Sequence, residues 1–116
     1  MNNGKKYNWY KVAESIAEIT QRGERSSMEV TVAGRTICLQ YYQQKLYACT
    51  AKCPHAGGRL AEGFMDNHGN IVCPLHRYCF NIKNGVNTSG EGYHLKTYPV
   101  QEDDNGVFIG IEVNTW

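Results

Sequence analysis

Short alternating stretches of apolar and polar side chains dominate the chain, and they predict strands rather than helices. β-branched and aromatic residues gather in brief runs bounded by turn-forming residues, which is typical of half-buried strands. The exception is the polar stretch from Glu14 to Arg25, where a short helical turn or a loop fits. The expected strands are residues 9–12, 28–32, 35–41, 45–50, 71–72, 78–83, 93–100 and 106–113.

Turn residues between these runs indicate how the strands connect. Ala33-Gly34 and Gln43-Gln44 each read as a tight turn between two strands, and Asn84-Gly85 is the strongest short hairpin signal in the chain. Further turns or loops are expected at residues 66–70, 88–92 and 102–105. The pattern predicts an all-β protein in which antiparallel strands from both ends of the chain form a base.

Length and charge narrow the class of protein. The chain has 116 residues, which predicts a single domain over residues 1–116, and a formal net charge of +1 gives no reason to expect a nucleic-acid partner. No apolar run approaches the roughly 20 residues of a membrane span. The basic N-terminal residues are not followed by the apolar stretch of a signal peptide. We therefore expect a soluble cytoplasmic protein that does not bind a membrane.

The candidate chemistry lies in two short segments, Cys53-Pro-His55 and Cys73-Pro-Leu-His76, separated by seventeen residues. Together they offer two thiolates and two imidazoles, which suit iron or zinc. A proline follows each cysteine and stiffens a loop that must hold a ligand, since its φ is fixed. Gly57-Gly58 allows the backbone to pass close to a bulky group. The four residues are therefore candidate metal ligands.

Three interpretations of these four residues are possible. A structural zinc site can use two cysteines and two histidines, but zinc fingers usually place both cysteines in one segment and both histidines in the other. Here each segment carries one of each, which suits a dinuclear cluster with one thiolate and one imidazole from each loop. The third interpretation is that these are unrelated residues of a small domain.

The motif resembles that of the Rieske family, whose [2Fe–2S] cluster has one iron on two cysteines and the other on two histidines. The resemblance extends to the strand-like residues 46–48 and 71–72 before the two loops and to the closing stretches 98–100 and 107–109. It implies one [2Fe–2S] cluster held by Cys53, His55, Cys73 and His76. It also implies an antiparallel β-sandwich with an inserted cluster-binding subdomain, about residues 50–86, that places the cluster at an exposed tip.

The three remaining cysteines could be reduced thiols or form a disulfide. Respiratory Rieske proteins join two further cysteines as a disulfide, and the corresponding positions here hold Gly57 and Leu75. Cys38, Cys49 and Cys79 are therefore expected to be reduced and unpaired, the first two as small core residues. The resemblance leaves open whether Cys79, or a third loop at Gly90–Tyr93, tunes the cluster.

The same resemblance gives the expected function. The sequence offers no general base, nucleophile or phosphate-binding loop, which leaves a one-electron carrier, an electron-transfer component of an oxidoreductase system rather than an enzyme by itself. Small Rieske ferredoxins pass electrons from a reductase, usually flavin-containing, to an oxygenase. The alternatives are a small Rieske subunit of a nitrite reductase-like enzyme and a regulatory or structural metal-binding module.

Overall fold

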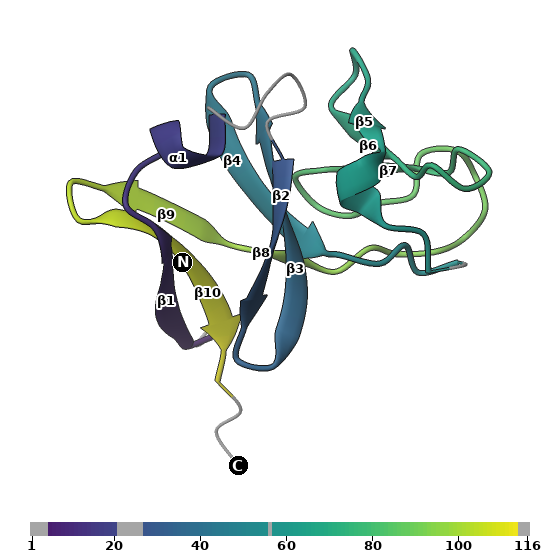
Figure 1. Ribbon diagram of the computed structural model, residues 1–116. Helices are drawn as coiled ribbons and strands as arrows, with labels where there is room; N and C mark the ends of the chain where they lie inside the picture. Colours follow the sequence, from purple (N-terminus) through teal and green to yellow (C-terminus); the bar gives the residue numbers. More distant parts are fainter. Residues whose placement is uncertain (1–4, 21–26, 56, 114–116) are drawn as a thin grey trace.

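The structure is a computed structural model that describes residues 5–20, 27–55 and 57–113, and its regular elements are almost all antiparallel strands (Figure 1). The strands form three sheets, ordered β1-β10-β9, β2-β3-β4-β8 and β5-β6-β7. The elements are β1 (Tyr7–Ala13), α1 (Ala17–Thr20), β2 (Ser27–Val32), β3 (Arg35–Tyr42), β4 (Lys45–Thr50), η1 (Leu60–Glu62), β5 (Phe64–Met65), β6 (Asn70–Val72), β7 (Cys79–Asn81), β8 (Thr97–Tyr98), β9 (Val100–Asp103) and β10 (Gly106–Glu112). The expectation of an all-β antiparallel fold is confirmed.

The two larger sheets pack against each other and make the base of the molecule. Strands from the two ends of the chain meet here, because β1 pairs with β10. The apolar core between the sheets draws on β3 and β4 on one side and on β10 on the other. Its buried members are Ile19, Val32, Ile37, Leu39, Leu46, Ala48, Val107, Ile109 and Ile111.

Strands β3 and β4 are buried on both faces, and this links the base to the metal-binding loops. Successive side chains of a strand point to opposite faces. Ile37 and Leu39 therefore enter the base core, whereas Cys38 enters a second core on the other side of the sheet. The second core also holds Leu60, Ile71, Cys73, Phe80, Ile82 and Leu95, with Cys49 and Cys53. This core supports the segment with strands β5, β6 and β7, which lies to one side of the base sheets (Figure 1).

The two tight turns expected on either side of β3 are confirmed. Ala33 and Gly34 have φ values of 50° and 78°, and Gln43 and Gln44 have φ values of 49° and 67°. Positive φ at both central residues defines the type I′ turn, whose twist matches that of the flanking strands. The turns fix the register of β2, β3 and β4, and so decide which side chains face each core.

The expectation for residues 93–100 is wrong in part. Only Thr97–Tyr98 and the separate strand that begins at Val100 are extended ladders, and His94 makes an isolated bridge with Val86. Pro99 divides the two strands because it has no N–H to give to a ladder. The acidic turn is also shorter than expected, since Glu102 and Asp103 belong to β9.

The Asn84-Gly85 turn lies where the sequence predicted it, but it is not a two-residue turn. Gly85 has a φ of 79°, and its N–H donates to the carbonyl of Asn81 at 2.7 Å. Asn81 N–H in turn donates to the carbonyl of Val86 at 2.8 Å. A longer turn therefore connects β7 to the segment that leads back toward the loops. In the described part of the chain, no helix has the length and apolar character needed to span a membrane.

Candidate metal centre

Each of the two Cys–His segments is a turn closed by its own backbone. In the first segment, Cys53 N–H donates to the carbonyl of Gly58 at 2.8 Å, and Gly57 N–H donates to the carbonyl of Cys53 at 3.0 Å. In the second, Cys73 N–H donates to the carbonyl of Tyr78 at 2.9 Å. Both cysteines therefore stand at the base of a closed loop, and each histidine lies farther along it.

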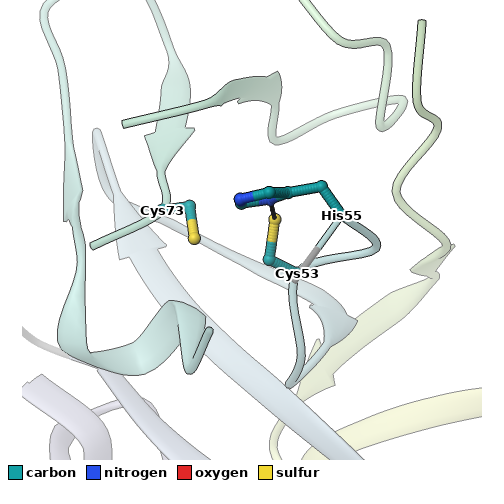
Figure 2. Close-up of side chains that lie close together, drawn as sticks. All are labelled: Cys53, His55 and Cys73. Atoms are coloured by element: carbon teal, nitrogen blue, oxygen red, sulfur yellow. Dashed lines mark hydrogen bonds between the residues drawn. The ribbon is translucent and has the colours of Figure 1, made fainter. Parts of the chain in front are cut away.

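The structure brings the predicted ligand atoms together. One ligand atom each from Cys53, His55 and Cys73 lies within 4.8 Å of the other two. Cys53 Sγ is 2.7 Å from His55 Nδ1, and both sulfur atoms lie beside the imidazole ring (Figure 2). His76 completes the set from the other side, with its Nδ1 3.2 Å from His55 Nε2. Cys53, His55 and Cys73 thus form one group of candidate ligand atoms, and His76 lies beside the Nε2 of His55.

The surroundings of these donors fit a group such as a [2Fe–2S] cluster. Cys53 and Cys73 are buried, His55 is half-buried and His76 is exposed, so the thiols face the second core and the imidazoles face outward. Gly58 lets the first loop pass close to the second: a Cβ there would lie 2.8 Å from Cys73 Sγ and 3.1 Å from Leu75 Cγ. The donor chemistry, two thiolates and two imidazoles, is that of a Rieske centre.

The backbone of the second loop adopts an uncommon conformation at the ligand itself. His76 and Arg77 have φ values of 64° and 58°, in the left-handed region that L-residues rarely occupy. Such conformations cost free energy and are held by surrounding structure, often at functional sites. Here two consecutive residues in this region reverse the chain and leave both side chains exposed. The spacing of the motif did not reveal this feature.

Two tyrosines lie against the first histidine. The Tyr78 ring stacks on the His55 imidazole, with centroids 3.8 Å apart and planes inclined by 26°. Tyr93 lies at the edge of this pair, 6.0 Å from the His55 ring and 5.9 Å from the Tyr78 ring. The expected third loop therefore does approach the centre, through Tyr93. Nothing in the spacing of the Cys and His residues indicates that Tyr78 stacks on His55.

The third loop is fastened by the side chain of Asn87. Its Nδ2 donates to the Cys79 carbonyl and to Glu91 Oε1, each at 2.9 Å, and its Oδ1 accepts the N–H groups of Glu91 and Gly92. Hydrogen bonds from Ser89 and Asn87, and the nearby His55, hold the pKa of the Glu91 carboxyl below its usual value. The loop thus places a carboxylate on the same side of the centre as His55.

The other cysteines and histidines are not members of the donor group. Cys38 and Cys49 face each other across β3 and β4, and the hydrogen bond between them, with burial, raises the pKa of the Cys49 thiol well above its usual value. Cys79 is half-buried and its Sγ donates to the carbonyl of Arg77 at 3.5 Å. His68 and His94 are exposed. They lie in the Asp66–Asn70 turn and beside the third loop, respectively.

We expect all five cysteines to be free thiols once the protein is denatured and freed of metal, as they are in the structure. Cys38 and Cys49 are both fully buried, and structural cysteines in such surroundings have little tendency to exchange into a disulfide. Thiol titration under denaturing, anaerobic conditions should give five thiols per chain, with the same count after treatment with a reductant as the control. A count of three or fewer would show that a disulfide exists.

The fold is all-β, and its two paired loops carry two buried thiols and two imidazoles nearer the surface. This combination is typical of iron–sulfur proteins whose cluster is bound by both cysteine and histidine. The comparison with protein families agrees, because the Rieske [2Fe-2S] domain matches residues 8–99. The chain belongs to this family, and the family's cofactor is a [2Fe–2S] cluster.

The similar proteins are ferredoxins of oxygenase systems. The chain is 31% identical over 84 residues to the ferredoxin component of the naphthalene 1,2-dioxygenase/salicylate 5-hydroxylase systems of a Ralstonia species, covering 72% of this chain and 80% of that one. It is 30% identical over 89 residues to the ferredoxin component of the naphthalene 1,2-dioxygenase system of Pseudomonas aeruginosa, covering 76% and 85%.

Solved structures show the same fold. The ferredoxin of carbazole 1,9a-dioxygenase from Nocardioides aromaticivorans IC177 matches with a TM-score of 0.74 at 22% identity, covering 88% of this chain and 96% of that one. A second match is to a chain in the reduced complex between oxygenase and ferredoxin in carbazole 1,9a-dioxygenase, with a TM-score of 0.74 and 28% identity. It covers 91% of this chain but only 29% of that chain.

Proposed function

We propose that Cys53 and Cys73 bind one iron of a [2Fe–2S] cluster and that His55 and His76 bind the other. The observation that supports this assignment is the grouping of Cys53, His55 and Cys73, with His76 beside His55, in a chain of the Rieske family. The single domain of residues 1–116, with a cluster-binding subdomain at about 50–86, follows from the same assignment. Bound in this way, the cluster supplies a site that takes up and releases one electron.

The protein works as a one-electron carrier of the ferredoxin type. Its residues bury the thiolates, orient the imidazoles toward the surface and exclude water from the inner side of the centre through the second core. Electron transfer between proteins requires close approach, and the outward imidazoles permit it.

The relatives suggest the partners. They are named as components of dioxygenase systems, and one structural match is a complex between oxygenase and ferredoxin. We therefore assign a flavin-containing reductase as the electron donor and an oxygenase as the acceptor, in the cytoplasm. No observation in the structure favours the nitrite reductase-like subunit or the regulatory module over this assignment.

A mediated-transfer assay tests the proposed function. A flavin-containing reductase of an aromatic-ring dioxygenase system, NADH and cytochrome c are mixed with and without the protein. A carrier makes the rate of cytochrome c reduction rise in proportion to its concentration, and the cluster-free protein is the control. A purified, cluster-loaded protein that dithionite reduces but that no reductase and no acceptor can use would contradict the carrier function.

Leu75 should contribute to partner contact. It lies between Pro74 and His76 at the tip, and its side chain is 45% exposed. In the Leu75→Glu variant, we expect electron transfer with the reductase to slow by about tenfold, because an apolar contact is replaced by a charge that must be desolvated. The comparable change Tyr10→Glu, at a 37% exposed position of β1, should leave the rate unchanged. Equal effects at both positions would show that the tip is not the docking surface.

A further inference from the structure

The two histidines of the centre differ in how far a partner can reach them. His55 is half-buried, and the rings of Tyr78 and Tyr93 lie against it. His76 is exposed, and its ring lies 6.3 Å from that of Tyr78, without stacking. Tyr78 therefore covers the face of one imidazole and leaves the other open.

The stack on His55 is fixed from both sides. The carbonyl of Tyr78 accepts a hydrogen bond from Cys73 N–H, which holds the Tyr78 backbone in place within the second loop. Tyr93 follows directly after Gly92, whose N–H is held by Asn87 Oδ1 at 2.9 Å. The ring of Tyr93 is in this way kept beside the His55–Tyr78 pair. Because offset aromatic stacking is itself favourable, the cover should persist in solution.

The charged side chains near the two histidines also differ in sign. Arg77 follows His76, is exposed and makes no ion pair among the residues that the structure describes. Glu91 lies on the His55 side, where its carboxylate accepts hydrogen bonds from Ser89 and Asn87. An approaching anion is thus attracted to the His76 side and repelled from the His55 side.

We propose that the redox tip is one-sided: Tyr78 and Tyr93 clamp and cover His55, and electrons enter and leave through His76 to a partner that presents a carboxylate to Arg77. Tyr78 and Tyr93 are positioning residues in this scheme, since they act through the imidazole. Leu75 and Arg77 flank the open histidine and form the recognition surface. The inference rests on the proposed function and specifies the chemistry of the partner's surface.

Small charged oxidants test the charge of the open side without any protein partner. The cluster-loaded protein is reduced with dithionite and then oxidised in stopped flow by ferricyanide, an anion, or by tris(bipyridine)cobalt(III), a cation. One electron leaves the protein and reduces one oxidant molecule, and no bond is formed. At low ionic strength, Arg77→Glu should slow oxidation by ferricyanide by at least about fivefold and speed oxidation by the cobalt complex. Both effects should vanish at high salt.

Matched charge reversals serve as controls. Lys52→Glu changes the charge equally next to the first loop, and Arg35→Glu does so on the base sheet; each should alter either rate by less than about twofold. If Lys52→Glu slows the ferricyanide reaction as much as Arg77→Glu, the one-sided tip is wrong. If the cluster-loaded protein accepts no electron from dithionite, the carrier function fails, and the following labelling experiment decides the inference by itself.

Chemical labelling reads the accessibility of the histidines directly. The oxidised, cluster-loaded protein is treated with diethyl pyrocarbonate, and the modified peptides are quantified by mass spectrometry. His76 should react at least about threefold faster than His55. Tyr78→Leu should raise the rate of His55 modification, whereas Tyr78→Phe, which keeps the ring, should leave that rate unchanged. Tyr93→Leu, in the third loop, should also raise it. Equal rates at the two histidines of the unchanged protein would overturn the inference.

Discussion

Replacing Gly85 by alanine is expected to destabilise the folded protein by about 3 kcal/mol or more. Gly85 has a φ of 79°, and a Cβ at this position would overlap the carbonyl oxygen of Leu95. That carbonyl belongs to backbone that cannot easily move, because Leu95 N–H donates to the carbonyl of Gly85 at 2.9 Å. Denaturant titration of the purified protein should show the loss in the free energy of unfolding.

Gly90 offers a matched control for the backbone conformation alone. Its φ is 89°, but no heavy atom lies within 4 Å of a Cβ built there. Gly90→Ala should therefore cost only the conformational strain of a left-handed alanine, about 1–2 kcal/mol. If the two variants lose the same stability, the close packing of the Asn84-Gly85 turn against Leu95 does not stabilise the fold.

Loss of a single ligand should remove the cluster. We expect Cys73→Ser and His76→Ala to be purified with less than about a tenth of the iron and sulfide of the unchanged protein, since each leaves an iron without one of its protein ligands. The visible absorption should fall in parallel. Iron and sulfide analysis per chain, with two of each expected for the unchanged protein, measures the effect.

The chain contains its own controls for these variants. Cys79→Ser changes a thiol that lies near the second loop but outside the donor group, and His68→Ala changes an exposed histidine in the Asp66–Asn70 turn. Both variants should keep full iron and sulfide content. A protein whose Cys79→Ser variant loses the cluster while Cys73→Ser retains it would show that the ligands have been assigned to the wrong residues.

Much of the fold could be predicted because local chemistry and global structure agree. The turns at Ala33-Gly34 and Gln43-Gln44 carry their signal in a few residues, and β2, β3 and β4 follow from them with ends that are correct to within one residue. The stretch after Gly92 could not be read correctly in this way. Its apolar residues resemble a strand, but Pro99 interrupts the ladder and the hydrogen bonds of Asn87 hold the preceding loop.

The site was predictable as a set of donors but not in its surroundings. The order Cys before His in both segments is visible in the sequence, and the structure groups Cys53, His55 and Cys73, with His76 beside His55. The stack of Tyr78 on His55 depends on the left-handed backbone at His76 and Arg77, which reverses the second loop. No spacing rule encodes that reversal, so the one-sided cover of the centre becomes visible only in three dimensions.

The environment of the cluster also bears on its reduction potential. Hydroxyl donors to the cluster raise the potential because they stabilise the reduced, more negative state. High-potential members of the family carry a serine and a tyrosine at the positions of Tyr78 and Phe80. Here Phe80 is fully buried and has no hydroxyl, and the Tyr78 ring is stacked on His55. Phe80 therefore supplies no donor, and the ring of Tyr78 is too long to substitute simply for a serine side chain, which predicts a low potential.

A redox titration followed by electron paramagnetic resonance tests the central claim most directly, because a single experiment reports cluster type, electron count and potential. We expect a one-electron signal with the low average g-value of histidine-ligated [2Fe–2S] clusters. Its midpoint at neutral pH should lie near the lower end of the Rieske range, about −150 mV rather than about +300 mV. A colourless zinc protein without a signal would contradict the cluster, and a midpoint above roughly +100 mV would contradict the low-potential carrier.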